Sequence, residues 1–322
     1  MNHRKWFSSL GLRYFLIGIL MMVVQIAVLA ISAAIAPDLL TDYYLLIAML
    51  PIYIVVVPIS AWLISLMPKK HLRSYNLTAG QIFRTFCICI FLMFAGNLVG
   101  SAINSGIAGL LGTDGGSTVA DVLGGSSIWQ TFVVAVLAGP AVEEFLFREL
   151  LIDRLVMYGD RAAILISALA FGFYHGNVIQ FVYAFLLGLV FGYIYIRTGK
   201  IIYTVILHML VNFWGSVVSQ LALGDGYVAA MEALENGMDP TVIAGRYAGP
   251  LIGFALFFLI YMIILVLGLI FLIRYVRKGR VVLLPGEYQL EPGSRFKTVV
   301  LNLGVILFIV YWIIMMITTI FS

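Results

Sequence analysis

The stretch Ala138-Gly-Pro-Ala-Val-Glu-Glu-Phe-Leu-Phe-Arg148 places two adjacent glutamates and an arginine inside a long, mostly apolar segment. A carboxylate at the centre of a membrane helix costs about 2.5–3.5 kcal/mol on insertion scales, so such a residue usually faces a polar cavity or a charged partner. The stretch therefore predicts a membrane helix that carries a buried polar site.

The composition of the whole chain agrees with a membrane location. The 322 residues are 63% hydrophobic and 11% charged, and their mean hydropathy is +1.08. A water-soluble domain of this length would not tolerate such a surface. Apolar runs long enough to cross a bilayer recur along the chain, and they give about nine candidate spans: 15–36, 43–67, 83–111, 128–155, 161–176, 179–196, 201–221, 250–273 and 298–321. The sequence thus predicts an all-α, polytopic transmembrane bundle with eight to nine helices around a buried polar site.

The charged residues predict the topology of these spans in the cell membrane. Placing the N-terminal Arg4, Lys5 and Arg13 in the cytoplasm puts the other basic groups there too, namely Lys69, Lys70, Arg73, Arg84, Arg154, Arg161, Arg197, Lys200 and the cluster at 274–280. The intervening loops are acidic or uncharged and carry Asp38, Asp42, Asp114, Asp121, Asp225, Glu232, Glu235 and Asp239 against a lone Arg246. We expect a cytoplasmic N-terminus and an extracytoplasmic C-terminus. The net charge of +4 forms no basic patch with interleaved aromatic residues, so we expect no nucleic-acid partner.

Three regions organise the chain. We expect N-terminal transmembrane helices in 1–127, helices that carry the buried polar site in 128–215, and an extracytoplasmic loop followed by C-terminal transmembrane helices in 216–322. The loop at 224–249 has room for a short amphipathic helix around 229–236. Small residues four apart, at Gly96 with Gly100 and at Gly188 with Gly192, favour close helix crossings.

The two glutamates have different surroundings on a helix. Glu144 and Arg148 are i,i+4 neighbours and can form a structural ion pair. Glu143 lies about 100° further round the helix, so it faces another direction and is the freer base. We expect Glu144 and Arg148 to support the site and Glu143 to act in it.

Two histidines lie in candidate spans near these acids. His175 ends the segment Phe171-Gly-Phe-Tyr-His175, and His208 shares one helix face with Asn212. Glu143 and His175 are about equally far from the turn near Gly159, so a regular helix on either side would bring them level in the membrane.

Three blocks of these residues resemble the CAAX-protease and bacteriocin-processing family, also called CPBP or ABI proteins. The blocks are Glu143-Glu144-x-x-x-Arg148, Phe171-x-x-x-His175 and His208-x-x-x-Asn212, in the family's order and on successive helices. The segment from Gly188 to Gly199 is also similar to the family. The resemblance covers about 128–215 and implies that this region is a CPBP-like catalytic core. Glu149 departs from the small residue that often follows the arginine.

The resemblance implies an intramembrane endopeptidase that cleaves a peptide or membrane-protein substrate. In such enzymes the residues matching Glu143 and His175 activate a water, and those matching His208 and Asn212 stabilise the oxyanion. General chemistry agrees, because burial makes a carboxylate a stronger base and amide or imidazole N–H groups stabilise a developing oxyanion.

Two questions stay open at this level. Two histidines and a glutamate are also a zinc-type ligand set, so a zinc cofactor is possible, although we favour catalysis without a cofactor because His-Glu-x-x-His is absent. Alternatively, the chain is a non-catalytic immunity or assembly protein, in which the polar cluster only makes contacts between helices. A proton-coupled transporter is a further alternative, but the sequence has no inverted repeat.

Overall fold

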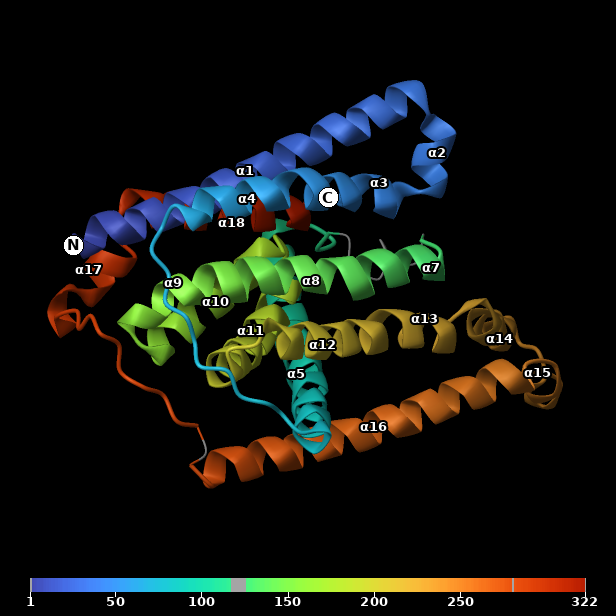
Figure 1. Cartoon of the computed structure of the whole chain (residues 1–322). Helices are drawn as coiled ribbons and strands as arrows, with labels where there is room; N and C mark the ends of the chain where they lie inside the picture. Colours follow the sequence, from blue (N-terminus) through green and yellow to red (C-terminus); the bar gives the residue numbers. More distant parts are fainter. Residues whose placement is uncertain (1, 117–125, 280, 322) are drawn as a thin grey trace.

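The computed structural model describes residues 2–116, 126–279 and 281–321, and in these residues the chain is predominantly helical (Figure 1). No β-strand forms within them, and the only pairing of that kind is an isolated bridge between Gly159 and Pro285. Asp121 and Arg280, which the topology prediction used, lie outside the described residues. The predicted all-α polytopic bundle is confirmed.

Eight helical stretches in the described residues are long and apolar enough to cross a membrane. They are α1 (His3–Ile35), α3 (Tyr44–Pro51) with α4 (Val57–Ser65), α5 (Ala79–Leu111), the fourth span Ile128–Tyr158 with α7 (Ile128–Thr131), α8 (Gly139–Glu144) and α9 (Asp153–Leu155), α11 (Val178–Thr198), α12 (Ile201–Asn212) with α13 (Ser219–Ala222), α16 (Ala248–Arg277) and α18 (Leu303–Ile320). The remaining predicted span, 161–176, is the helix α10 (Asp160–Tyr174) of 15 residues. At 1.5 Å per residue α10 is about 22 Å long, which is short of a hydrocarbon core of about 30 Å.

Local backbone signals explain why α10 is short. It begins after Gly159, whose φ is +100°, and ends before Gly176, whose φ is +60°. The next residue, Asn177, caps α11 by accepting hydrogen bonds from the backbone N–H groups of Ile179 and Gln180. The apolar run therefore splits into a tight hairpin of α10 and α11.

Four shorter α-helices and a 3-10 turn at Pro292–Ser294 complete the helices of the described residues. The four α-helices are α2 (Pro37–Asp42), α14 (Asp225–Glu235), α15 (Pro240–Arg246) and α17 (Arg295–Val299). Helix α14 confirms the helix predicted in the loop at 224–249, and it packs on α16 together with α15.

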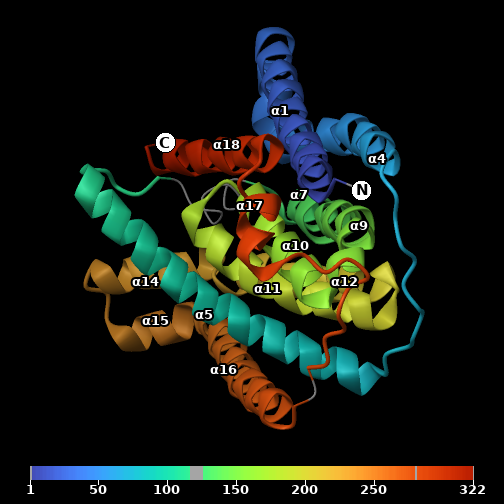
Figure 2. The ribbon, with the colours of Figure 1, turned by 90° about the vertical axis from the view of Figure 1, so that its left-hand side faces the viewer.

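The helices run in two general directions. In Figure 1, α1, α4, α8, α12 and α16 run across the view, whereas α5 crosses them steeply. Figure 2 shows α5 along its length, and α5 packs against both α11 and α16. Helix α10 packs on α11, on the fourth span and on α18, and its Ser167 and Ala168 have no exposed surface. The short helix thus packs against longer ones on its inner face.

Glycines allow the close crossings around α11. A β-carbon built at Gly96 would lie 2.7 Å from Cα of Tyr183, and one at Gly100 would lie 2.7 Å from the carbonyl oxygen of Ile179. At the contact between α11 and α10, a β-carbon built at Gly188 would lie 2.9 Å from Cα of Ala168. The predicted crossings at both glycine pairs are confirmed.

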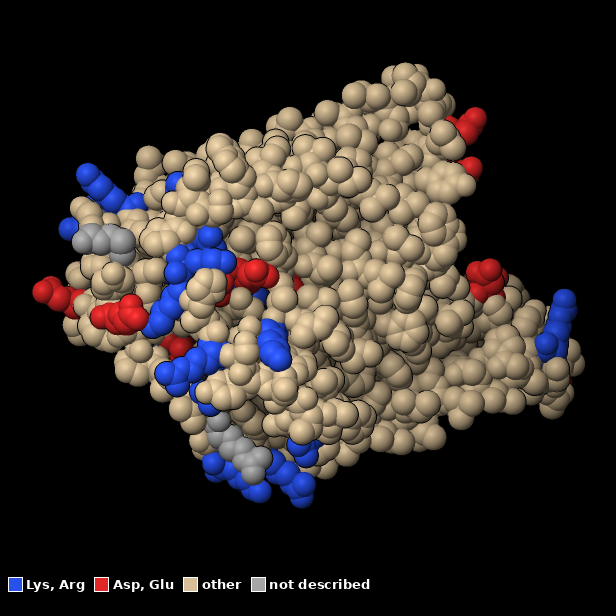
Figure 3. Space-filling model, viewed as in Figure 1, with Lys and Arg blue, Asp and Glu red and all other residues tan. Residues whose placement is uncertain are grey.

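The loops and the N-terminal end that the charge pattern assigned to the cytoplasm, here called the connectors, lie together at one end of the bundle. Four hydrogen bonds join them to helix ends: Lys70 N to Asp153 O (2.8 Å), Tyr75 N to Thr198 O (2.8 Å), Tyr288 N to Met157 O (3.0 Å) and His3 Nδ1 with Tyr158 Oη (3.0 Å). Figure 3 shows most of the visible basic atoms gathered around this end, at the left of the view. Helices α9 and α11 both end there. The α10–α11 hairpin therefore enters the bundle and returns at the same end, although α10 is too short to span a membrane.

Candidate active site

The fourth span is an irregular helix around its two glutamates. The short α-helical piece α8 (Gly139–Glu144) lies between two π-helical segments, Phe132–Ala138 and Phe145–Ile152. In the first of them the Gly139 N–H bonds the carbonyl of Val134, five residues earlier. π-Helical turns are rare and frequently occur at functional sites.

This irregularity creates a partner for Asn212. In the π register the carbonyl of Ala135 would accept from residue 140, but Pro140 has no N–H. The carbonyl instead accepts a hydrogen bond of 2.8 Å from Nδ2 of Asn212 on α12. An unpaired carbonyl is costly in a membrane protein, so this bond links α12 to the fourth span and fixes the Asn212 carboxamide.

Glu144 and Arg148 form the buried pair predicted from their spacing. Neither side chain has exposed surface, and Arg148 Nε donates to Oε2 of Glu144 at 2.9 Å. A second guanidinium nitrogen donates to Ser167 Oγ of α10 at 2.7 Å, and this hydroxyl donates to the carbonyl of Phe147. The guanidinium carbon also lies 4.8 Å from the ring centre of Phe171. The charge of Arg148 is therefore compensated on several sides.

His208 lies between the two carboxylates. Its Nδ1 is 3.1 Å from Oε1 of Glu144, and its Nε2 is 3.7 Å from Oε2 of Glu143. Because Glu144 is already paired with a guanidinium, it is a carboxylate, and Nδ1 is the donor to it. The Nε2 atom then faces Glu143. The Glu143 side chain is 18% exposed, whereas that of Glu144 is fully buried, so Glu143 is the accessible acid of the two.

His175 lies next to His208 with the ring of Phe171 in contact with both imidazoles. Its Nδ1 lies 2.8 Å from the carbonyl oxygen of Phe171, and so its Nδ1 carries the proton and Nε2 is the acceptor. The Phe171 ring contacts both imidazoles edge-on, with centroids 4.9 Å from His175 and 5.7 Å from His208. His175 is also near enough to Glu143 for electrostatic interaction. The short contact of Glu143, however, is with His208 and not with His175, the partner that the resemblance implied.

The family comparison covers this whole arrangement. Residues 125–214 match the family model described as type II CAAX prenyl endopeptidase Rce1-like. The chain carries an Rce1-like CAAX endopeptidase domain. Glu143, His175, His208 and Asn212 all lie inside the Rce1-like domain, and the resemblance noted in the sequence is confirmed. Searches of curated proteins and of solved structures found no significant match.

Among the described residues of the Rce1-like domain, no group of three His, Cys, Asp or Glu side chains is placed to hold a metal ion. Nδ1 of His208 is directed at Glu144 and Nδ1 of His175 at a carbonyl oxygen, so Nε2 is the free nitrogen of each imidazole. We derive no step through a metal.

Three contributors to the site were not predicted from the sequence. Ser167 precedes Phe171 and His175 at i,i+4 and i,i+8 spacing, so a shared helix face was a signal that could have found it. Phe191 of α11 packs its ring 5.3 Å from that of His208. Tyr53, from the second span, has its hydroxyl near Gly139, and no motif marks this tyrosine.

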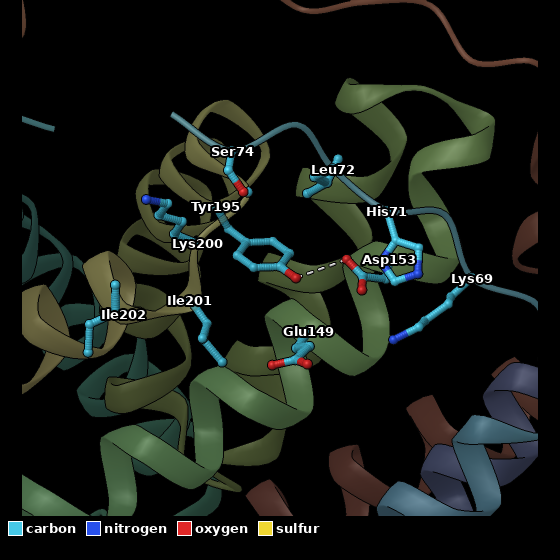
Figure 4. Close-up of a pocket in the computed structure, with 11 residues that line it drawn as sticks. Lys69, His71, Leu72, Ser74, Glu149, Asp153, Tyr195, Lys200, Ile201 and Ile202 are labelled. Carbon is cyan, nitrogen blue, oxygen red and sulfur yellow. Dashed lines mark hydrogen bonds between the residues drawn. The ribbon is translucent and has the colours of Figure 1, made fainter. Parts of the chain in front are cut away.

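A separate polar cavity of about 440 Å³ lies near the end of the bundle where the connectors meet (Figure 4). Its lining includes Lys69, His71, Glu149, Asp153, Tyr195 and Lys200. The Tyr195 hydroxyl donates to Oδ1 of Asp153 at 2.9 Å, which joins α11 to α9. Glu149, which departs from the family pattern, lines this cavity. None of the residues named above around His208 is among the described residues that line it.

Proposed function

We propose that this chain is an intramembrane endopeptidase that hydrolyses a peptide bond with water activated by Glu143. The observation that carries the proposal is His208, whose Nδ1 faces a fixed carboxylate at 3.1 Å while Nε2 faces a second, accessible carboxylate at 3.7 Å. A base oriented by a third group is the arrangement that activates nucleophiles in hydrolases.

The first step is proton removal from water. Glu143 accepts the proton as the water oxygen attacks the carbonyl carbon of the substrate. His175 contributes its free Nε2 as an acceptor that orients this water, because its Nδ1 proton is held by the Phe171 carbonyl. The attack leaves negative charge on the former carbonyl oxygen.

The second step is collapse of this tetrahedral intermediate. The proton taken by Glu143 passes to Nε2 of His208, and the resulting imidazolium is stabilised by the carboxylate of Glu144. The imidazolium and the remaining amide hydrogen of Asn212 donate to the oxyanion. The C–N bond then breaks as the leaving nitrogen takes the proton from Nε2, which returns His208 to its starting tautomer.

The proposed catalysis depends on glutamate, and zinc-dependent catalysis is the alternative mechanism. Activity that a chelator abolishes and added zinc restores would overturn the glutamate-dependent mechanism. The substrate class is a peptide or membrane-protein segment in the bilayer, and residues 128–215 form the catalytic core.

The proposed topology follows the basic end of the bundle. The positive-inside tendency assigns the end with the joined connectors to the cytoplasm. The N-terminus is then cytoplasmic and the C-terminus extracytoplasmic, with 1–127 and 216–322 contributing the flanking helices.

The decisive experiment compares membrane and secreted peptides from cells that express the wild type, Glu143→Gln, His208→Gln or Glu149→Gln. We expect new peptide termini in the wild type and in Glu149→Gln, a matched control six residues further along the chain. At equal protein abundance we expect none in Glu143→Gln or His208→Gln. If Glu143→Gln produces the same peptide termini as the wild type, the proposed peptidase function is refuted. Full biological complementation by that variant would then favour the immunity or assembly role.

A further inference from the structure

The second span brings an unassigned hydroxyl to the candidate active site. Tyr53 lies in the π-helical segment Ile52–Val56 between α3 and α4, outside the Rce1-like domain. A β-carbon built at Gly139 would lie 3.3 Å from the Tyr53 hydroxyl and 3.8 Å from Oε1 of Glu143. Both oxygens therefore border the same small space in front of Gly139.

The Tyr53 hydroxyl differs from other buried tyrosine hydroxyls in this bundle. Tyr14 donates to the carbonyl of Leu146 at 2.7 Å, and Tyr195 donates to Asp153 at 2.9 Å. Tyr53 is half-buried, and its hydroxyl makes no hydrogen bond to another of the described residues. Its ring packs against the hydrophobic core, so the hydroxyl is held in position while its proton remains free to donate.

The proposed reaction needs a donor at this place. One amide hydrogen of Asn212 is committed to Ala135, and Nδ1 of His208 is committed to Glu144. A water held by Glu143 attacks a carbonyl carbon in the space before Gly139, so the oxyanion forms within a few ångströms of both bordering oxygens. A phenol keeps its proton at neutral pH and can donate without an intervening charge.

We propose that Tyr53 is a further catalytic residue, whose hydroxyl donates a hydrogen bond to the oxyanion formed during peptide hydrolysis. The proposal rests on the peptidase function proposed above. It also gives Gly139 a role, because any side chain there would fill the space that the reacting carbonyl occupies.

The test uses the full-length protein in lipid vesicles and a synthetic peptide that spans a cleavage site dependent on Glu143. Removing one oxyanion donor typically lowers kcat by about 10²–10³-fold. For Tyr53→Phe we expect kcat to fall at least about tenfold with KM within about threefold, because the ring is retained and only the transition state loses a contact. Thermal unfolding should be unchanged. Tyr44→Phe, an exposed tyrosine on the same span, should cleave like the wild type.

A further variant keeps the test independent of folding. A fluorinated tyrosine at position 53, whose phenol is a stronger hydrogen-bond donor, should change kcat while KM and thermal unfolding stay unchanged. A purely structural role would leave kcat unchanged.

The outcomes separate this inference from the proposed function. If no cleavage depends on Glu143, the peptidase itself is refuted and Tyr53 with it. If Glu143→Gln is inactive while Tyr53→Phe keeps kcat within about twofold, the Tyr53 assignment alone is overturned. A rise in KM with unchanged kcat would make Tyr53 a binding residue, which also contradicts an oxyanion donor.

Discussion

Nδ1 of His208 lies 3.1 Å from Oε1 of Glu144, an acid whose other oxygen is 2.9 Å from Nε of Arg148. The three side chains come from two different spans and are all almost completely buried. The ion pair therefore does more than neutralise two charges: it holds the imidazole that faces Glu143.

Loss of Arg148 should destabilise the bundle and disorder His208. Removing one partner of a buried ion pair typically costs about 3–5 kcal/mol, because the other charge stays buried without compensation. We expect Arg148→Ala to lower the unfolding temperature in detergent and to abolish cleavage. Arg161→Ala, an exposed arginine at the start of α10, is the control. An equal effect of the two substitutions would contradict the structural role of Arg148.

The bond from Asn212 to Ala135 should depend on Pro140. We expect Asn212→Ala to destabilise by about 1 kcal/mol, because a part-buried carbonyl is left without its donor. Pro140→Ala restores a backbone N–H near that carbonyl, so Asn212→Ala should cost less in the Pro140→Ala background. A double-mutant cycle on unfolding free energies measures this coupling. Strictly additive effects would show that the proline does not free the carbonyl.

Helix α5 offers a matched pair of glycines. Gly96→Ala places a methyl group 2.7 Å from Cα of Tyr183, whereas Gly106→Ala meets no atom within 4 Å. We expect the first to destabilise by about 1–3 kcal/mol through overpacking against α11. The second should be neutral or stabilising by up to about 1 kcal/mol, since alanine favours helix. Thermal unfolding of both variants in detergent is the measurement, and a harmless Gly96→Ala would argue against this crossing.

The topology can be read by labelling single cysteines. The two native cysteines, Cys87 and Cys89, are free and fully buried, so they should not react. Added cysteines at exposed Ser74 and Thr41 lie on opposite sides in the proposed topology. A membrane-impermeant maleimide on whole cells should label Thr41→Cys at once and Ser74→Cys only after permeabilisation. The reverse pattern would invert the proposed topology.

The candidate site divides into parts that local spacing reveals and parts that it does not. The Glu144–Arg148 pair follows from i,i+4 geometry on one helix, and it forms as expected. The nearest imidazole to Glu143 did not follow from spacing, because an estimate of depth along the helices cannot give their rotation. Rotation about the helix axes turned His208 towards both glutamates.

The sequence by itself determined that this protein is a helical membrane bundle and which residues are its buried polar groups, because hydropathy and the i,i+4 spacing act over a few turns of one helix. Tertiary structure decided that α10 stays a short helix packed against longer ones, that Asn212 bonds the carbonyl exposed by Pro140, and that Tyr53 reaches the site from another span. These relations depend on how helices cross and rotate against one another. Such packing is a property of many side chains at once, and no single stretch of sequence contains it.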